Sequence, residues 1–262
     1  MYAEERQERV EQLVAESTRV SVIDLARLFD VTTETVRRDL TQLESRGLLR
    51  RVHGGAVSTG KTSRAEESIA QRRVRNAAAK ERIAQLAMNL VPSTFSGAVA
   101  IDAGTTTGLL AEHLSRWTPE KPHQSLVVIT NSVAVAAIVS ENPDLEVQLL
   151  GGRLRGITSA AVGATTLTQL SRLRPDIAFV GANGVHADFG LSTPDEEESA
   201  VKTAFTKGAR RAVALVDASK LGEEALVRFA DLTDLDTLIT DQAPAADLGD
   251  ALARAEVEVM VA

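Results

Sequence analysis

The chain has 262 residues, of which 44% are hydrophobic and 25% charged, as in ordinary globular proteins of one or two domains. It has no cysteine, which excludes disulfides, thiolate catalysis and cysteine-ligated metal, and its net charge is -7. No apolar run approaches the roughly 20 residues of a membrane span, and the N-terminus is too charged for a signal peptide. We therefore expect a cytoplasmic protein with no membrane partner.

The acidic charge is not spread evenly along the chain. Residues 1–57 carry nine Arg against ten acidic residues, residues 58–82 carry a net +4, and residues 83–262 carry a net -10. Within the first block, residues 36–53 have a net charge of +3. The acidic total therefore belongs mostly to the C-terminal part and does not argue against DNA binding by the N-terminal part.

Residues 1–57 have the pattern of a winged helix-turn-helix domain. Apolar spacing predicts a helix over residues 4–16, and Ser21 is placed to cap a second helix, "VIDLARLF". Thr32 is the expected cap of a third helix, which runs to about Arg46 and stops at Gly47. The following "LLRRVHGGAV" predicts a short hairpin, the wing.

The third helix is the candidate DNA-reading element. An apolar stripe of Val36, Leu40 and Leu43 would face the other helices, leaving Arg37 and Arg38 exposed and about 100° apart. One arginine could then reach bases while the other holds a phosphate. The predicted DNA contacts are Thr32, Thr33, Thr35, Arg37, Arg38, Arg50, Arg51 and His53. The alternative is a solvated polar face of an interaction domain, which the capped three-helix pattern and the clustered arginines disfavour.

A short run after the wing, "GAVSTGKT" at residues 55–62, matches the P-loop pattern of nucleotide-binding proteins. A working P-loop follows a buried strand and opens a helix packed in an α/β core. Here a polar hairpin precedes the run and a charged segment follows it. A nucleotide-dependent regulator is therefore a disfavoured alternative.

The rest of the chain alternates between helix-like and strand-like segments. Residues 58–82 are predicted to be a basic linker and the start of a connecting helix over about residues 66–90. Strand-like runs lie at 98–102, 126–130, 146–150, 177–182, 212–216, 237–240 and 256–261, and helix-like segments at about 106–116, 132–140, 161–172, 195–210 and 245–254. This alternation predicts a doubly wound α/β domain with a mostly parallel sheet over residues 83–262.

The ends of the predicted strands carry the candidate ligand-binding groups. In "DAGTTT", residues 102–107, a strand ends, a tight turn follows and threonines open a helix, which offers free N–H donors and hydroxyls to a phosphate. Polar groups at the carboxyl ends of parallel strands converge on one crevice. The mixture of carboxylates and amides with Thr, Arg and Lys indicates a phosphorylated sugar. The predicted effector-binding residues are Asp102, Gly104, Thr105, Thr106, Thr107, Thr130, Asn131, Gly151, Gly152, Arg155, Asn183, Asp195, Glu197, Lys202 and Lys220. Each also has a purely structural interpretation, as a helix cap or a surface charge.

Both halves of the chain resemble one family. Arg6, Val10, Val14, "TVRRDL" and "GLLRRVHGGAV" are similar to the DNA-binding part of the DeoR family of bacterial transcriptional regulators. "DAGTTT", "VVITNS", "LLGGRLR", "VGANGV", "GLSTPDEEE" and "DASKLG" are similar to its C-terminal sensor domain, and "MYAEERQ" and "GLSTPD" look most like its fructose- and lactose-operon repressors. Asn183 stands where the family often has Asp.

This resemblance implies a sensor fold like that of ribose-5-phosphate isomerase. It also implies a repressor of a sugar-catabolic or transport operon that binds double-stranded operator DNA and responds to a sugar phosphate, with no further cofactor. Asp102 would orient the loop and a sugar hydroxyl, and Thr105 to Thr107, Arg155 and Lys220 would hold the phosphate. Asn131, Asn183, Asp195, Glu197 and Lys202 would bind the sugar. Operator half-sites about 34 Å apart require a homodimer or homotetramer.

One alternative function remains open at this point. An active sugar-phosphate isomerase with a DNA-binding appendage could use Glu197 as a base beside Lys202. No metal is predicted, because the four histidines, at positions 53, 113, 123 and 186, lack metal-ligand spacing.

Overall fold

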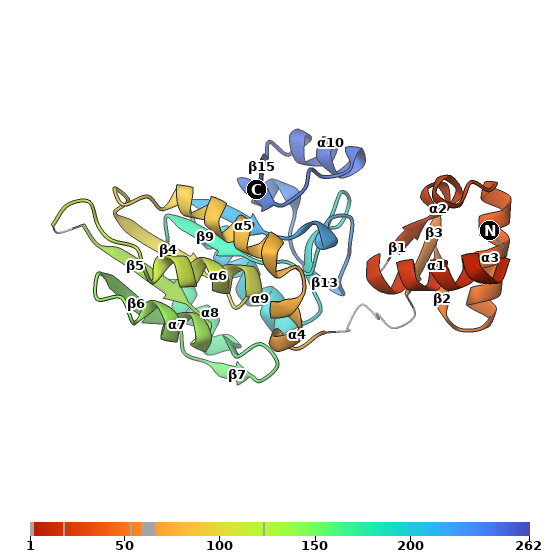
Figure 1. Ribbon diagram of the computed structural model, residues 1–262. Coiled ribbons are helices and arrows are strands. Elements are labelled where there is room, and N and C mark those ends of the chain that lie inside the picture. Colours follow the sequence, from red (N-terminus) through yellow and green to blue (C-terminus); the bar gives the residue numbers. More distant parts are fainter. Residues whose placement is uncertain (1–2, 18, 53, 59–65, 123) are drawn as a thin grey trace. The chain divides into compact units, whose positions relative to one another are not determined.

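The structure is a computed structural model that describes residues 3–17, 19–52, 54–58, 66–122 and 124–262 (Figure 1). The chain divides into two compact units, Met1–Ala65 and Glu66–Ala262. Among the described residues, no helix is long and apolar enough to cross a membrane.

The N-terminal unit is a winged helix-turn-helix. Its helices are α1 (Ala3–Ser17), α2 (Val22–Phe29) and α3 (Thr33–Ser45), and its antiparallel strands β1 (Arg19–Ser21), β2 (Leu49–Val52) and β3 (Gly55–Ser58) lie in the order β1-β3-β2. The strands β2 and β3 form the predicted wing. The three predicted helices and the wing are thereby confirmed.

Local side-chain hydrogen bonds cap the starts of α2 and α3. The Ser21 hydroxyl accepts from the Ile23 N–H at 3.1 Å and caps α2, while Thr32 accepts from the Thr35 N–H at 3.2 Å and caps α3. Side chains of all three helices and of β2 and β3 close the small core, which includes Val10, Val14, Leu25, Leu40, Leu43, Leu49 and Ala56.

The second unit is built on a seven-stranded sheet whose neighbouring strands all pair in parallel. The strands are β4 (Gly97–Ile101), β5 (Leu126–Thr130), β6 (Leu145–Leu149), β9 (Ile177–Val180), β12 (Arg211–Leu215), β14 (Thr237–Thr240) and β15 (Glu258–Val261), in the order β15-β14-β12-β9-β4-β5-β6. They are the seven strands predicted from the apolar runs. The strand order reverses between β4 and β9, where ligand sites of open α/β sheets lie.

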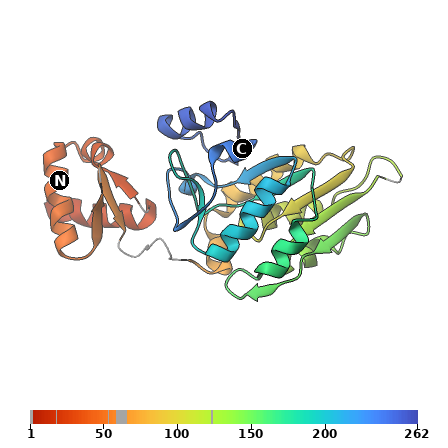
Figure 2. The same cartoon turned by 180° about the vertical axis from the view of Figure 1, so that it is seen from behind.

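Helices cover both faces of this sheet, as expected for a doubly wound fold. One core packs side chains of α5 (Ala77–Ala87), α6 (Thr105–Leu114) and α7 (Val133–Val139) on one face. The other core packs side chains of α8 (Ala164–Leu170), α9 (Glu196–Gly208) and α10 (Ala246–Arg254) on the opposite face. The two views show these layers, with α5 and α6 in front in Figure 1 and the green α8 and blue α9 in front in Figure 2.

Several short elements were not predicted. They are β1 of the N-terminal unit, the antiparallel pair β7 (Arg153–Arg155) and β8 (Ala160–Val162), the three-stranded sheet of β10 (Gly184–His186), β11 (Gly190–Thr193) and β13 (Val227–Ala230), and the 3-10 turns η1 (Met88–Leu90), η2 (Ala218–Lys220) and η3 (Leu232–Asp234). Each spans only three or four residues, too few for a hydrophobic period to be recognised.

The predicted connecting helix over residues 66–90 is broken into two. It forms α4 (Ile69–Val74) and α5, separated by Asn76 in the left-handed conformation, with φ of 54°. Asparagine tolerates the left-handed conformation better than most residues, and the Asn76 amide is held by a hydrogen bond that it donates to Asp217 Oδ1 at 2.8 Å. The Lys80 ammonium donates to the Arg75 carbonyl at 2.7 Å and replaces a helical partner there. The break ends the helix at Val74, and α4 packs on α6.

Candidate functional site

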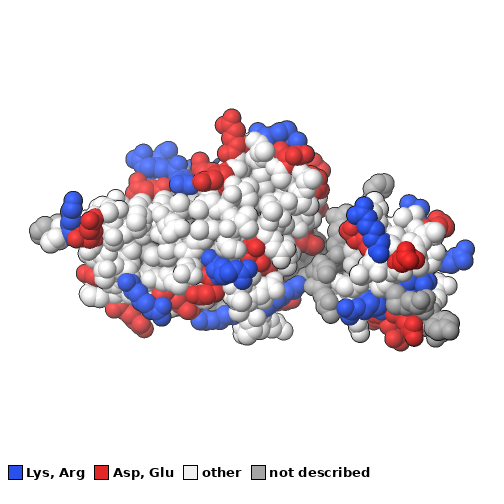
Figure 3. All heavy atoms as spheres, turned by 45° about the horizontal axis from the view of Figure 1, so that its top comes forward, with Lys and Arg blue, Asp and Glu red and all other residues white. Residues whose placement is uncertain are grey.

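The outer face of α3 carries the predicted DNA contacts of the helix. Arg37 and Arg38 are exposed, and Arg37 lies 3.6 Å from Glu34 in a solvent-exposed ion pair. Thr32 and Thr35 share a hydrogen bond of 2.9 Å at the helix start, and Thr33 is partly exposed beside them. In Figure 3, basic and acidic side chains are interspersed on the visible faces of both units.

The wing is fastened to α3 by one of its predicted DNA contacts. The Arg51 guanidinium donates to Thr41 Oγ1 at 2.8 Å, and the Arg51 N–H donates to Glu44 Oε1 at 2.8 Å. Arg50 is exposed on the same strand. His53 and the "TGKT" end of the P-loop-like run lie outside the described residues. The described part of that run, β3, is an antiparallel wing strand and not the buried parallel strand that a P-loop follows.

A buried ion pair inside the N-terminal unit was missed by the sequence analysis. Asp39 is 4% exposed and accepts from Arg6 Nε at 2.6 Å and from Gln7 Nε2 at 3.1 Å. The pair joins α1 to α3 at the back of the DNA-reading face. In the sequence, Asp39 stands between Arg38 and Leu40, a setting that is also typical of an exposed helix position. The sequence therefore gives no indication that Asp39 is buried.

The sensor unit has a pocket at the carboxyl ends of β4 and β9, where the strand order reverses. Eight of the predicted effector-binding residues line it: Asp102, Gly104, Thr105, Thr106, Asn131, Asn183, Lys202 and Lys220. Gly104 precedes α6 without a side-chain cap, so the first N–H groups of this helix have no partner within it. The site thus combines a helix N-terminus with hydroxyl, amide and ammonium groups.

Asp102 organises the floor of this pocket. One carboxylate oxygen accepts from the Gly104 N–H at 3.0 Å and from the Thr107 hydroxyl at 2.7 Å. The other accepts from the Gly181 N–H at 2.8 Å and from the Lys202 ammonium. With two donors on each oxygen, Asp102 joins the ends of β4 and β9 and positions the loop before α6. These bonds leave its predicted second role, holding a sugar hydroxyl, without a free acceptor.

Other predicted residues lie outside the pocket lining. Thr107 donates to Asp102, and the buried Thr130 donates to the Ile101 carbonyl at 2.6 Å. Gly151 and Gly152 are exposed at the end of β6, where the Gly151 carbonyl accepts from Thr166. These four residues support the loops around the site.

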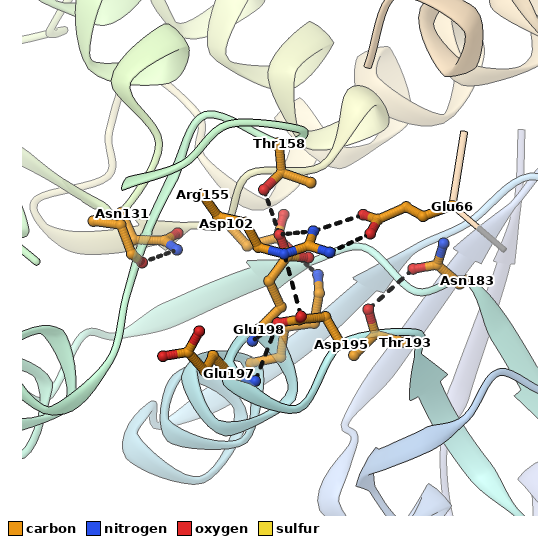
Figure 4. A network of polar contacts seen from close by, with 12 residues as sticks. Glu66, Asp102, Asn131, Arg155, Thr158, Asn183, Thr193, Asp195, Glu197 and Glu198 are labelled. Carbon is orange, nitrogen blue, oxygen red and sulfur yellow. Dashed lines mark hydrogen bonds and ion pairs between the residues drawn. The ribbon is translucent and has the colours of Figure 1, made fainter. Parts of the chain in front are cut away.

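The remaining three belong to a network of charges centred on Arg155 (Figure 4). Arg155 contacts Glu66 at 2.5 and 2.9 Å, Glu198 at 3.0 Å and Asp195 at 3.3 Å. The hydrogen bond to Glu66 raises the pKa of Arg155 further above its ordinary value, although burial opposes it. Asp195 also caps α9, accepting from the Glu197 N–H at 3.1 Å, and Glu197 pairs with Arg153. The Arg155 guanidinium is therefore paired with three carboxylates in the structure, and its role as a phosphate ligand stays a prediction.

The contacts of Glu197 and Lys202 also bear on the isomerase alternative. Lys202 binds Asp102 and the Gly181 carbonyl, whereas Glu197 binds Arg153. The base and lysine that the enzyme hypothesis needs are thus engaged with different partners.

The connecting segment forms a wall of the pocket that was not predicted from the sequence. Glu67, Arg72, Arg75 and Lys80 line the pocket, together with Glu198 and Asp217. Arg75 pairs with Glu67 at 3.1 Å, and Lys80 donates to the carbonyls of Arg72 and Arg75. The net charge of +4 over residues 58–82 indicated that this segment could bind an anion. The sequence alone does not show whether such charges face DNA or the sensor pocket.

Burial is the largest single influence on the pKa of two lining residues, but it sets the direction of the shift only for Lys80. Burial lowers the pKa of Lys80, partly opposed by the charge of Asp217. For Asp217 burial acts to raise the pKa, but the Ser219 hydroxyl, Lys220, Asn76 and Lys80 outweigh it, so the pKa lies below its usual value. Across the described residues, no group of three or more His, Cys, Asp or Glu could hold a metal ion.

A winged helix-turn-helix joined to an α/β unit with a polar pocket at its switch point defines the class of ligand-responsive DNA-binding regulators. Two family models match the chain, the DeoR-like helix-turn-helix domain over residues 6–62 and the DeoR C-terminal sensor domain over residues 75–242. The chain belongs to the DeoR family of transcriptional regulators, as the sequence motifs indicated.

Known relatives support this assignment along the whole chain. The chain is 36% identical to the HTH-type transcriptional regulator GlpR of Haloferax volcanii, over 99% of this chain and 98% of that protein. It is 34% identical to the lactose phosphotransferase system repressor of Streptococcus mutans, over 92% and 93%. These names describe regulators, in agreement with the prediction that the chain is a regulator and not an enzyme.

Among solved structures, the chain is similar to a D-ribose-5-phosphate isomerase in complex with phospho-erythronic acid. The TM-score is 0.38, with 16% identity over 54% of this chain and 52% of that chain. A similarity this low defines neither the fold nor the function of the chain. The α/β class follows from the parallel sheet itself.

Proposed function

We propose that this protein is a cytoplasmic repressor of a sugar-catabolic or transport operon, and that a phosphorylated sugar sets its affinity for operator DNA. In this proposal residues 1–57 read the operator, residues 83–262 sense the effector, and residues 58–82 connect the two. A homodimer or homotetramer would present paired helices to half-sites about 34 Å apart. Relatives named as repressors, including that of a lactose phosphotransferase system, support this assignment.

The observation that carries the proposal is the composition of the sensor pocket. It joins the uncapped N-terminus of α6, with Thr105 and Thr106, to a buried amide, because Asn131 is 3% exposed. Asn131 Oδ1 has no hydrogen-bond partner among the described residues. A helix N-terminus favours a phosphate, and a buried amide oxygen is suited to accept from a sugar hydroxyl. A phosphorylated sugar carries both of these groups, a phosphate and hydroxyls, in one molecule.

For DNA, the proposal assigns base reading to α3 and phosphate contacts to its start and to the wing. Arg37 and Arg38 are exposed on α3, and Arg50 on β2. Arg51 holds Thr41 and Glu44, so its main role in this proposal is to set the wing against α3.

The test is an operator-binding assay run against phosphorylated sugars. Operator sequences would first be enriched from random duplexes on the full-length protein. The dissociation constant for that duplex would then be measured with inorganic phosphate, glycerol 3-phosphate, fructose 1-phosphate and glucose 6-phosphate, each sugar phosphate paired with its unphosphorylated counterpart.

We expect at least one sugar phosphate to weaken operator binding by about ten-fold or more, while its unphosphorylated counterpart does not. Equal effects of both forms would contradict the phosphate site. Failure to enrich any duplex would contradict DNA reading by α3.

A further inference from the structure

The segment that leads from the DNA-binding unit into the sensor unit forms part of the pocket wall. Glu67, Arg72 and Arg75 lie on this segment and line the same pocket as Thr105 and Thr106. The helix α4 packs on α6, and the Arg73 guanidinium contacts Glu112 of α6 at 2.5 Å. The connecting segment is therefore placed beside the helix whose N-terminus opens into the pocket.

Arg72 differs from the neighbouring cations in its hydrogen bonding. Its Nε and Nη2 atoms are buried, yet they have no hydrogen-bond partner among the residues that the structure describes. By contrast, Arg73 contacts Glu112, and Arg155 contacts three carboxylates. Buried guanidinium donors without partners are rare, because burial removes their water without replacing it.

The pocket supplies a complementary reason for these donors. It holds the free N–H groups at the start of α6 and, independently, the unpartnered oxygen of the buried Asn131. A guanidinium presents parallel N–H groups that match two phosphate oxygens. A phosphate at the start of α6 would thus meet donors from two elements.

We propose that Arg72 is a phosphate ligand of this pocket, so that a bound phosphosugar is held by the connecting segment as well as by α6. This inference rests on the proposed function, and it adds to it a residue and a route for the signal. The phosphate then forms a tie between α6 and α4, the first helix after the DNA-binding unit.

The rest of the segment is already fastened to the sensor unit on either side of Arg72. Arg155 holds Glu66 through two contacts, and Lys80 binds the carbonyls of Arg72 and Arg75. Asn76 adds its bond to Asp217. Arg72 lies between these anchors in the chain. A phosphate that binds its unpartnered donors would therefore change the contacts of α4 while the anchors hold the rest of the segment in place.

The test compares full-length wild type with Arg72→Gln, Arg72→Lys and the matched control Arg73→Gln. Arg73→Gln removes the same charge one residue along, from a side chain that does not line the pocket. Each protein would be titrated by calorimetry with inorganic phosphate, glycerol 3-phosphate, fructose 1-phosphate and glucose 6-phosphate, after circular dichroism has shown native secondary structure.

For every compound that wild type binds, we expect Arg72→Gln to weaken binding by about ten- to hundred-fold. Arg72→Lys should recover part of this loss, because lysine keeps the charge without the planar pair of donors. Arg73→Gln should bind within about two-fold of wild type, because its exposed ion pair contributes little.

A second readout follows the segment itself. Hydrogen exchange over residues 69–75 should slow when wild type or Arg73→Gln binds a phosphate compound, and should change little in Arg72→Gln at equal occupancy. A purely structural role of Arg72 would alter exchange before any compound is added.

The outcomes separate this inference from the proposed function. If wild type binds sugar phosphates and Arg72→Gln binds them equally well, the inference is overturned and the proposed function stands. Equal losses in Arg72→Gln and Arg73→Gln would overturn it too, since general charge would then explain both. If wild type binds none of the compounds, the proposed function and the inference fail together.

Discussion

The carboxylate of Asp39 shows how one residue can support a DNA-reading helix without facing DNA. It is buried against Arg6 and Gln7 of α1, while Arg37 and Arg38 beside it in sequence are exposed. We expect Asp39→Asn to lower the free energy of unfolding of the N-terminal unit by about 3 kcal/mol, because it removes the buried carboxylate that pairs with Arg6. Urea denaturation followed by circular dichroism would measure this.

The matched control for Asp39→Asn is Glu34→Gln on the same helix. Glu34 forms an exposed ion pair with Arg37, so its replacement should change the unfolding free energy by less than about 0.5 kcal/mol. Equal effects of the two changes would contradict a special role for the buried pair.

Asp217 gives the sensor unit a predictable response to acid. Its folded pKa lies below the ordinary value of 3.8, so its contribution to stability is complete above that pH and is lost as the pH falls through the folded pKa. Asp217→Asn should therefore lower the urea midpoint at pH 7, and the difference from wild type should shrink below about pH 4. Urea midpoints between pH 7 and pH 3 would check this.

The exposed Asp250 on α10 provides the control for this pH series. Asp250→Asn should leave the urea midpoint nearly unchanged throughout. A constant difference between Asp217→Asn and wild type down to pH 3 would speak against the assigned pKa direction.

Among the elements of the sensor unit, α6 has one glycine within it, Gly108, and another just before it, Gly104. The two differ in the space that an added side chain would find. A Cβ on Gly104 would lie 2.7 Å from Thr107 Oγ1, whereas a Cβ on Gly108 meets nothing within 4 Å. Gly104→Ala should cost about 1–2 kcal/mol by displacing the Thr107 hydroxyl from Asp102. Gly108→Ala should instead stabilise by up to about 1 kcal/mol, because alanine loses less backbone entropy in a helix.

Thermal unfolding of the two variants measures both effects in one helix. A lower midpoint for Gly104→Ala and a higher one for Gly108→Ala are expected. Similar shifts in the same direction would show that the loop before α6 is not held by the Asp102 network.

For the whole molecule, the two-unit architecture predicts that DNA reading and effector sensing are separable. Arg38→Ala should weaken binding to the enriched operator by about ten- to hundred-fold, because a base contact is lost, and leave sugar-phosphate binding unchanged. Gel shift and calorimetry would measure the two activities. Arg9→Ala, an exposed arginine of α1, is the control for charge alone.

The converse change is Thr106→Ala at the start of α6. It should weaken binding of a sugar phosphate by about ten-fold through loss of one hydroxyl donor, while operator affinity without sugar stays at the wild-type value. Loss of operator binding in Thr106→Ala would contradict the separation of roles, as would normal operator binding by Arg38→Ala.

Much of the fold could be predicted because its main elements are locally encoded. The strand β9 is apolar and buried along its whole length because the sheet is covered on both faces. The strand β4 is likewise apolar, and β12 is apolar and buried after its first residue, Arg211. Ser21 and Thr32 mark helix starts through bonds to residues two or three positions away. The connecting helix was the exception, since the left-handed Asn76 is stabilised by Asp217, 141 positions further along the chain.

The sequence by itself therefore determined the winged helix-turn-helix, the parallel sheet, the family and the loop of Asp102 to Thr106, because periodicity, capping and strand ends are local features. Only the tertiary structure decided which charges share a site. It brings Lys202 into contact with Asp102 and places Arg72 in the pocket wall. It also pairs Arg155 with the carboxylates of Glu66 and Glu198, which lie far apart in the sequence. Ion pairing depends on distance in space and on burial, and neither is written in the spacing of charges along a chain.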